Sequence, residues 1–377
     1  MRARIAPTPL AEILKGRIRS AGPITFAEYM EACLYHPDFG YYSRPDFPPR
    51  RDYFTSVDVS PVFGRLLARQ FDQMWRLLGK PGEFVIAEAG AGSGALARQI
   101  LDCAHESLGE FAEALRYLAI ESSAARRSGH ARVLEKHFAR GRVESREDLP
   151  EAISCGCIFS NELLDAFPVH RVLGRQGELR EIYVSVGDEG FCEEAKPLSK
   201  PALADYFRKQ GIALQDEQQA EAGPAACDWI ARAGRILQKG FVLTIDYGHE
   251  ARELYDDRHI RGTLLAYAGH RASEDFYRAP GEQDLTAHVN FTALDLWGRA
   301  GGLERAGFTS QTNFLLSLAR RSGFSDVDFE GKDEPGQTRA RLLFKTLIHP
   351  EGMGETFQVF AQRKGIEACT LAGFEPL

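Results

Sequence analysis

Hydrophobic positions along the chain change their spacing near residue 84. Before that point apolar residues recur every three or four positions, as they do on one face of an amphipathic helix. Thr25 and Glu28 have the spacing of a capping box in front of one such run. A second, longer amphipathic helix is predicted from Val62 to Leu78. We therefore expect residues 1–80 to form an N-terminal helical cap.

Beyond residue 84, short apolar runs alternate with helical stretches, which indicates a mainly parallel sheet with crossover helices. Each of the four clearest runs ends against a polar or acidic residue. These runs are Phe84 to Ala87, Leu115 to Ile120, Cys155 to Phe159 and Phe241 to Ile245, followed by Glu88, Glu121, Ser160 and Asp246 respectively. Ligands of open α/β sheets bind at the carboxyl ends of the strands. The pattern predicts an α/β fold for residues 81–377, with its binding site among these end residues.

The stretches between and after these runs predict further elements. Residues 181–194 have the pattern of a β-hairpin, and residues 222–237 that of a helix. Two C-terminal apolar runs, at 342–348 and 357–362, suit a closing antiparallel pair of strands.

One long segment, residues 250–309, shows little periodicity. An irregular insertion of that length in a compact domain is usually functional, often as a lid or a substrate-binding loop. We expect insertions at about 172–222 and 250–309 to form a lid on the substrate side of the 81–377 core.

Composition and charge exclude several classes of protein. The chain has 377 residues, of which 44% are hydrophobic and 26% charged, as in an ordinary globular protein. A net charge of −7 argues against a broad nucleic-acid-binding face. No apolar stretch reaches the roughly 20 residues that span a bilayer, and no signal-peptide core follows the N-terminal arginines. We expect a cytoplasmic protein without nucleic-acid or membrane partners; the oligomeric state stays open.

The seven cysteines do not suggest a disulfide framework or a metal site. Cys155 and Cys157 are one residue closer together than the cysteines of a zinc knuckle, and they begin an apolar run. We interpret them as strand residues and expect no bound metal.

Candidate chemistry concentrates in the turn Glu88-Ala89-Gly90-Ala91-Gly92-Ser93-Gly94. A glycine-rich turn between a strand and a helix brings free backbone amides close to a ligand. Its glycines also satisfy the dinucleotide pattern GxGxxG/A, so on this motif alone an oxidoreductase stays open. Glu88 favours S-adenosylmethionine, because a carboxylate there would repel a pyrophosphate but suits the ammonium of a methionine moiety. Glu121 fits an acceptor for ribose hydroxyls, and the predicted cofactor contacts are Glu88, Gly90, Gly92, Gly94 and Glu121.

Several further blocks occur in order along nearly the whole chain. They are residues 24–30 (ITFAEYM), 34–37 (LYHP), 40–42 (GYY), 52–56 (DYFTS), 160–168 (SNELLDAFP), 245–248 (IDYG) and 280–289 (PGEQDLTAHV). Together with the glycine turn, they resemble the MidA family of methyltransferases, which includes a mitochondrial factor that methylates an arginine of a respiratory complex I subunit. The chain departs from its relatives at Ala91 and Ser93, where proline and arginine are frequent, and at Asn290, where aspartate is usual.

The resemblance implies a class I methyltransferase fold, Rossmann-like, with a seven-stranded sheet, an N-terminal helical cap and large insertions over a site at the sheet edge. Methyl transfer from a sulfonium is an in-line displacement, so the protein mainly aligns the nucleophile and excludes water. We predict that Asn161 and Glu162 lie beside the transferring methyl, and that Glu162 or Asp165 binds a cationic group such as a guanidinium. Both acids could instead have structural roles at a helix start. His288 could act as a base, orient substrate or be a structural loop histidine.

Candidates with weaker support surround this set. Thr55 and Ser56 are candidate cofactor contacts from the N-terminal cap, or loop-packing residues. Asp148 could receive the adenine amino group, or cap a helix at the surface. Asp246 and Tyr247 are candidate substrate contacts at the end of a core strand.

The sequence therefore predicts an S-adenosylmethionine-dependent methyltransferase acting on an arginine of a protein partner. Two alternatives stay open at this point: a small-molecule O- or N-methyltransferase of secondary metabolism, and a catalytically silent scaffold for assembly or binding.

Overall fold

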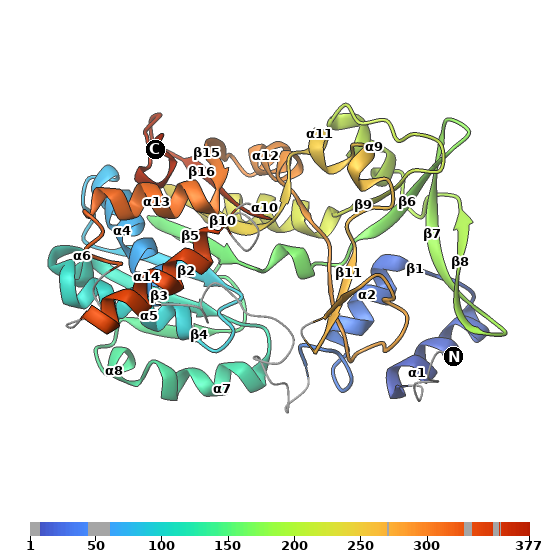
Figure 1. The fold of residues 1–377 in the computed structure, drawn as a ribbon, viewed down its shortest axis with the longest axis horizontal. Helices are drawn as coiled ribbons and strands as arrows, with labels where there is room; N and C mark the ends of the chain where they lie inside the picture. The colour runs from blue at the N-terminus through green and yellow to red at the C-terminus, as the bar shows by residue number, and fades with distance from the viewer. Residues whose placement is uncertain (1–7, 44–60, 270, 328–333, 350–353, 355) are drawn as a thin grey trace. The chain divides into compact units, whose positions relative to one another are not determined.

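The chain forms two compact units, each assembled from three separate stretches of sequence. The computed structural model describes residues 8–43, 61–269, 271–327, 334–349, 354 and 356–377 (Figure 1). The first unit comprises Met1–Tyr53, Leu164–Asp228 and Gly248–Leu294, and the second comprises Phe54–Leu163, Trp229–Tyr247 and Asp295–Leu377. The expected boundary at residue 80 does not coincide with a boundary between the units, because the first 80 residues contribute to both.

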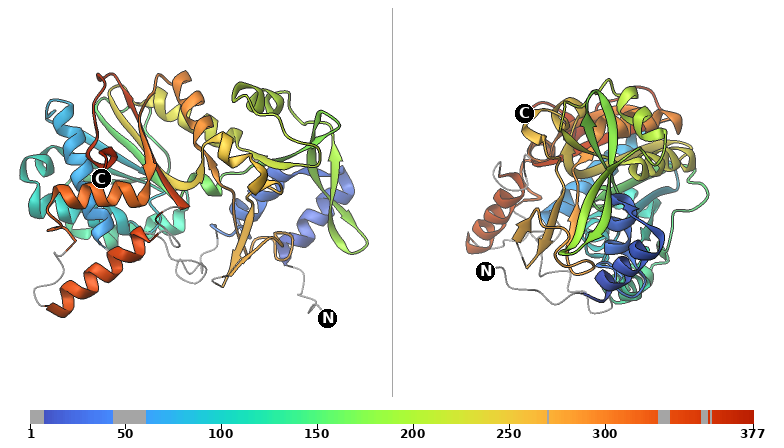
Figure 2. Two further views of the ribbon diagram at one scale, coloured as in Figure 1. Left: turned by 45° about the horizontal axis from the view of Figure 1, so that its top comes forward. Right: turned by 90° about the vertical axis from the view of Figure 1, so that its right-hand side faces the viewer.

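The second unit is built on a sheet whose main path has seven strands, in the order β15-β16-β10-β5-β2-β3-β4. Figure 1 labels these strands, and Figure 2 gives two further views of the ribbon. Strand β16 runs antiparallel to both its neighbours, and the pairs from β10 to β4 are parallel. The strands are β2 (Phe84–Ala89), β3 (Leu115–Ile120), β4 (Val143–Arg146), β5 (Gly156–Asn161), β10 (Gly240–His249), β15 (Glu304–Ser310) and β16 (Phe357–Lys364). All four predicted core strands are confirmed, because strands buried on both faces have nearly continuous apolar runs.

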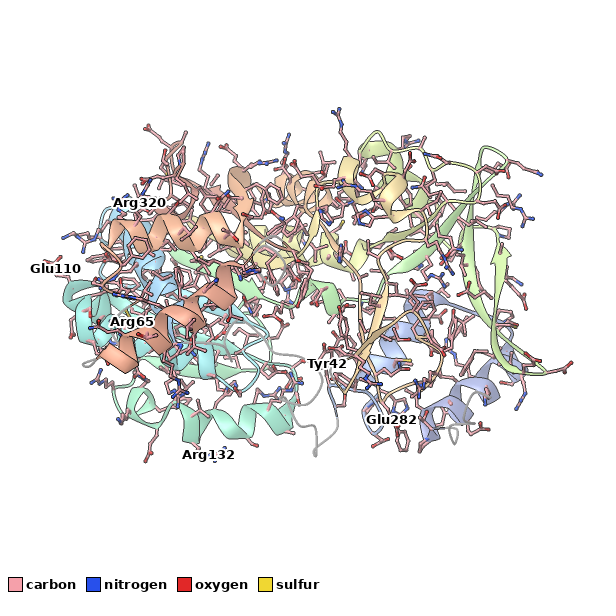
Figure 3. The ribbon with its side chains drawn as sticks, in the orientation of Figure 1. Tyr42, Arg65, Glu110, Arg132, Glu282 and Arg320 are labelled. Carbon is pink, nitrogen blue, oxygen red and sulfur yellow. The ribbon has the colours of Figure 1, made fainter. Side chains whose placement is uncertain are left out.

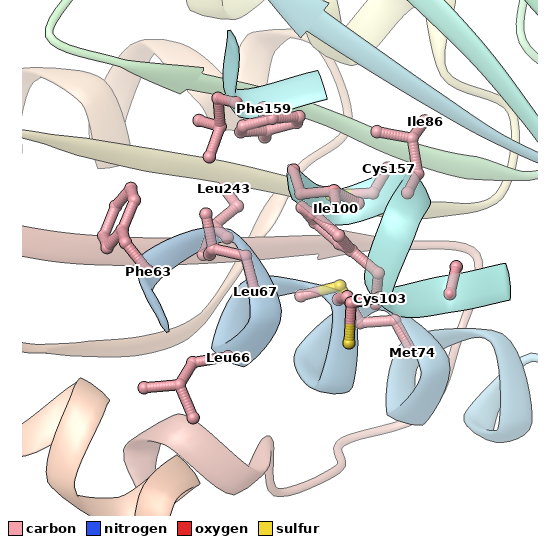
Figure 4. Close-up of a cluster of buried hydrophobic side chains, with 14 of the residues drawn as sticks. Phe63, Leu66, Leu67, Met74, Ile86, Ile100, Cys103, Cys157, Phe159 and Leu243 are labelled. Atoms are coloured by element: carbon pink, nitrogen blue, oxygen red, sulfur yellow. The ribbon is translucent and has the colours of Figure 1, made fainter. Parts of the chain in front are cut away.

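Helices of the second unit pack on this sheet around one hydrophobic core. They are α4 (Val62–Leu77), α5 (Ala95–Ser107), α6 (Gly109–Ala114), α7 (Ala124–Val133), α8 (Glu135–Phe138), α13 (Gln311–Arg321), α14 (Glu334–Ile348) and the short η4 (Ala372–Phe374). Two more helices, α10 (Pro224–Ile236) and α12 (Phe291–Ala300), cross from the first unit into the second along the chain. Figure 4 shows Phe63 and Leu67 of α4 and Ile100 of α5 beside strand residues such as Phe159 and Leu243. The predicted helix from Val62 is confirmed as α4.

The first unit contains two smaller sheets. One has five strands, β1 (Ile24–Thr25), β6 (His170–Arg175), β7 (Glu178–Gly187), β8 (Gly190–Lys196) and β9 (Gln219–Ala222); the other has β11 (Leu265–Ala268), β12 (Arg271–Ser273) and β13 (Asp284–Thr286). A two-residue strand, β14 (Val289–Asn290), pairs with the end of β10. The helices are α1 (Pro9–Ala21), α2 (Phe26–Tyr35), α9 (Ala202–Lys209), α11 (Ala251–Leu254), and the 3-10 turns η1 (Leu164–Ala166) and η2 (Asp257–His259).

The capping box, the hairpin and the helix predicted from the sequence are confirmed. Thr25 Oγ1 accepts from the Glu28 amide at 3.2 Å and Glu28 Oε2 accepts from the Thr25 amide at 3.0 Å, so the capping box starts α2. The predicted hairpin is β7 and β8, and the helix predicted at 222–237 is α10. Tyr42, labelled in Figure 3, donates its hydroxyl to Asp284 Oδ1 at 2.7 Å, tying the loop after α2 to β13.

The C-terminal prediction was wrong for residues 342–348, which belong to helix α14 rather than to a strand. Their buried neighbours Ala340, Phe344 and Leu347 have helical spacing, while Leu342 is 61% exposed. Residues 357–362 do form a strand, β16, whose antiparallel partners are β10 and β15.

The segment 250–309 is more regular than its sequence suggested. It contains short strands, helix α12 and strand β15. Strand β15 gave no signal because none of its seven side chains is fully buried, as suits an edge strand with little apolar alternation. No helix formed by the described residues has both the length and the apolar character that a membrane crossing requires.

Candidate active site

Four neighbouring parallel strands of the second unit, β10, β5, β2 and β3, end at the same edge of its sheet. Glu88 lies near the end of β2, Glu121 follows β3, and Asn161 is the last residue of β5. Ile245 of β10 is in register with Asn161, so Asp246 lies one position further along the adjacent strand. This edge collects five of the predicted residues, since Glu162 directly follows Asn161.

The glycine turn joins β2 to α5 in a conformation that needs glycine. Gly90, Gly92 and Gly94 have φ angles of +76°, +53° and +79°, in the left-handed region that side chains disfavour. The amides of Gly90 and Ala91 both donate to the Ile120 carbonyl at 2.9 Å, which anchors the turn on β3. A Cβ on Gly90 would lie 3.0 Å from Leu163 Cδ1. Hydrogen bonds and close packing therefore hold this turn in place at the start of α5.

Glu121 fastens the same turn from β3. Its Oε2 accepts from the Gly92 amide and its Oε1 from the Ser123 amide, both at 2.9 Å. A carboxylate oxygen has two lone pairs, so each of these atoms keeps acceptor capacity for a ribose hydroxyl. The predicted role of Glu121 as a ribose acceptor is compatible with its structural one.

His130 is a site residue that no sequence pattern indicated. It is fully buried on α7; its Nε2 lies 2.9 Å from the Gly92 carbonyl and its Nδ1 lies 2.8 Å from Ser145 Oγ of β4. A carbonyl only accepts, so in the neutral ring Nε2 donates and Nδ1 accepts from the serine. The surrounding helix, with three arginines and few apolar residues, gave no signal of a buried histidine.

Glu88 is almost completely buried, with 3% of its surface exposed. Burial raises the pKa of its carboxyl to about 8, against the lowering effect of the hydrogen bond from the Tyr117 hydroxyl and with a smaller raising effect from Glu121. An arriving cation would favour ionisation of this acid. Glu88 thus has the environment of a carboxyl group that becomes charged when it meets an ammonium.

The ends of β5 and β10 carry a second group of acceptors. Asn161 Nδ2 donates to Glu162 Oε1 at 3.0 Å, and Asn161 Oδ1 is buried with no hydrogen-bond partner among the described residues. Glu162 has a φ angle of +52°, a costly conformation for a residue with a side chain, which persists only where the surroundings impose it. Asp246, fully buried, accepts from the amides of Leu163 at 3.2 Å and Tyr247 at 3.0 Å.

The other candidates lie in different settings. Asp148 forms a two-fold ion pair with Arg232 at 2.8 and 2.6 Å, and Tyr247 packs its ring on Phe357 with centroids 4.0 Å apart. Thr55 and Ser56 lie outside the described residues.

Asp165 and His288 belong to the first unit, whereas Asn161 and Glu162 belong to the second. Asp165 lies in η1, and its carbonyl accepts from the Ala287 amide at 3.0 Å. His288 donates its amide to Thr263 Oγ1 at 3.0 Å and lies beside two other histidines.

Comparison with known proteins identifies relatives of the whole chain. Residues 66–309 match a family of S-adenosyl-L-methionine-dependent methyltransferases. The mouse protein arginine methyltransferase NDUFAF7, mitochondrial, is 29% identical over 94% of this chain and 84% of its own length; the human protein of the same name is 28% identical over 94% and 83%. A crystal structure from Burkholderia thailandensis bound to S-adenosyl-homocysteine has a TM-score of 0.86 and 32% identity, covering 99% of this chain and 98% of the other.

These relatives contradict the expectation of a cytoplasmic protein, because the mouse and human proteins are mitochondrial. That expectation rested on the lack of a signal-peptide core, which excludes only the secretory route; import into mitochondria uses amphipathic, arginine-rich segments instead.

The seven-stranded sheet, its glycine turn and the close likeness to a structure that binds the demethylated cofactor confirm the predicted fold, and they make S-adenosylmethionine the cofactor. The chain is an enzyme and belongs to the MidA family of S-adenosylmethionine-dependent methyltransferases.

Proposed function

We propose that this methyltransferase transfers the methyl group to an arginine side chain of a protein. The observation that carries the proposal is the group of acceptors at the ends of β5 and β10, above all the buried Asn161 Oδ1 without a hydrogen-bond partner among the described residues. A buried acceptor without a donor costs free energy unless a ligand supplies one. A guanidinium, which has five N–H donors and no acceptor, supplies donors in abundance. The names of the mouse and human relatives point to the same substrate class.

The remaining residues of the edge suit the cofactor. Glu88 would bind the ammonium of the cofactor's methionine part, and the glycine turn would place its own backbone close to the cofactor. Glu121 would accept hydrogen bonds from the ribose hydroxyls of the cofactor. The bound cofactor supplies an electrophilic methyl on a sulfonium. Asn161 and Glu162 would orient the guanidine nitrogen for in-line attack, and Glu162 or Asp246 would balance the positive charge of the incoming group.

The test is transfer of a labelled methyl group from S-adenosylmethionine to proteins of a mitochondrial or bacterial extract, followed by mass spectrometry of the labelled residue. We expect methylated arginine. Label recovered only in small molecules would favour the small-molecule alternative, and no transfer together with no cofactor binding would favour the silent scaffold.

Two variants test whether Asn161 and Glu162 position the nucleophile. Asn161→Ala and Glu162→Gln should each lower turnover by 100-fold or so if they position the nucleophile, while the Kd for S-adenosyl-homocysteine stays within a few-fold of the wild type. Glu110→Gln is a matched control, because Glu110 lies on α6 with an exposed side chain (Figure 3). Unchanged turnover in both site variants would remove these residues from the proposal.

A further inference from the structure

Three histidines of the first unit converge although they are 10 and 29 residues apart in sequence. His249 ends β10, His259 ends η2, and His288 lies between β13 and β14. The pairing of β14 with the end of β10, Gly248 with Val289, brings His288 next to His249. The ring centroids of His249 lie 5.3 Å from those of both His259 and His288, and the last two are 6.1 Å apart. One ring nitrogen from each histidine lies within 4.8 Å of the other two.

The partners of the rings leave one nitrogen of each available. His249 Nδ1 lies 3.3 Å from the Glu253 carboxylate, and His259 Nδ1 lies 3.0 Å from the Glu253 carbonyl. Both rings therefore carry their proton on Nδ1 and keep the lone pair of Nε2. A ring nitrogen fixed in this way by a carboxylate or a backbone carbonyl is the usual support of a metal-binding histidine.

His288 completes the set from the segment between β13 and β14. Its Nδ1 is buried and has no hydrogen-bond partner among the described residues. An unsatisfied buried nitrogen, on a ring that lies beside two other imidazoles, is unfavourable by itself and favourable as a metal ligand.

The protonation states agree with this arrangement. Burial, with the charges of His249 and His259 second, lowers the pKa of His288 to about 4; burial also lowers the pKa of His249. A neutral imidazole is the form that binds a metal ion.

We propose that His249, His259 and His288 bind one transition-metal ion, with Zn²⁺ as the best match. Imidazole ligands suit this class of ion, and three histidines leave the fourth tetrahedral position for water or another ligand. Ideal tetrahedral geometry places ligand nitrogens about 3.3 Å apart, so small ring rotations from the present spacing close the site. The ion would hold β10, η2 and the segment before β14 together. This proposed metal site does not depend on which molecule accepts the methyl group.

The experiment uses the full-length protein treated with a chelator and then titrated with ZnSO₄ by calorimetry and with CoCl₂ by visible absorption. We expect one equivalent of Zn²⁺, the intense bands of tetrahedral Co²⁺, and a Tm that rises on adding Zn²⁺. His259→Ala and His288→Ala should each weaken Zn²⁺ binding by at least 10-fold, and Glu253→Gln should weaken it by 10- to 100-fold through the loss of ring support.

His105→Ala is the matched control, because His105 lies on α5 of the second unit, outside the cluster. It should keep the wild-type Zn²⁺ affinity. The proposal is overturned if the wild-type protein gives no tetrahedral Co²⁺ bands, a result that does not depend on any variant folding. It is equally overturned if His288→Ala, folded by circular dichroism, binds Zn²⁺ as tightly as the wild type.

Discussion

Glu88 illustrates how the fold sets the chemistry of a single residue. Its carboxyl is buried near the end of β2 and accepts a hydrogen bond from the Tyr117 hydroxyl at 2.8 Å. The pKa of about 8 means that the ligand-free protein keeps much of this acid protonated at neutral pH. A cationic ligand that ionises Glu88 on binding would release a proton.

The raised pKa predicts a pH dependence of stability. Between the ordinary value of 4.5 and about 8, the folded state binds a proton at Glu88 that the unfolded state lacks, so the free energy of unfolding falls as the pH rises. The contribution of Glu88 is fully present below pH 4.5 and is lost as the pH passes 8. Glu88→Gln, which cannot ionise, should therefore gain stability relative to the wild type between pH 5 and pH 9.

Urea unfolding of both ligand-free proteins across this range measures the difference. Parallel curves of unfolding free energy against pH would show that Glu88 titrates normally. Calorimetry of S-adenosylmethionine binding in buffers of different ionisation enthalpy should detect proton release in the wild type and not in the variant.

At this scale the sequence revealed the residues that follow apolar strands and hid those that depend on tertiary contacts. Glu88 and Glu121 stood out because a polar residue after a buried run is visible locally. His288 stood out only as a single candidate, and its grouping with His249 and His259 was hidden, because no local spacing connects residues that tertiary contacts such as the pairing of β14 with β10 bring together. The sequence did not indicate the left-handed backbone of Glu162 either, because the surrounding structure imposes that conformation.

At the scale of helices and strands, a substitution can test the contact between α7 and the glycine turn. His130 bridges the Gly92 carbonyl to Ser145, so it fixes the turn relative to β4. His130→Ala would leave a buried carbonyl and a hydroxyl without this partner, which should cost roughly 2 kcal/mol of unfolding free energy. It should also weaken binding of S-adenosyl-homocysteine severalfold, because the turn loses its support.

Ser145→Ala is the control, since it removes one hydrogen bond and leaves the one to Gly92. Its effect on ligand affinity should be smaller than that of His130→Ala. Equal affinities in the wild type and His130→Ala, measured by calorimetry, would show that the turn does not need the histidine.

The element predictions succeeded where one face or both faces of an element are buried. Strand β3 and helix α4 were located within a residue or so because their apolar pattern matches their period. The pattern predicts a strand where helix α14 lies, because a short apolar run such as residues 342–348 has no distinct period until the buried positions Phe344 and Leu347 are known. Strand β15 is stabilised by its ladder to β16 rather than by burial of its own side chains.

For the whole molecule, the family and fold could be predicted because ordered sequence blocks cover nearly the full length. The division into two units could not, because it depends on contacts between Met1–Tyr53, Leu164–Asp228 and Gly248–Leu294, which are far apart along the chain. Long insertions were visible as stretches between the core strands; their joining into one unit was not.

The position of β16 bears on how the chain folds during synthesis. Among the strands of the described residues it comes last along the chain, yet it lies between β10 and β15 in the sheet. The first unit has all its segments once Leu294 has been made, whereas the sheet of the second unit lacks an inner strand until Lys364. Nascent chains begin to fold from their N-terminal side, but this sheet has to wait.

Ribosome-bound chains stalled at different lengths, each with a linker that clears the exit tunnel, should therefore become protease-resistant in two steps. Protection of the first unit should appear in chains that extend beyond residue 294, and protection of the second only in chains that include β16. Resistance of β2 to β5 in a chain stalled before Phe357 would mean that the parallel strands fold without it. Until β16 has been made, the sheet that carries the cofactor edge would lack an inner strand and could be bound by chaperones.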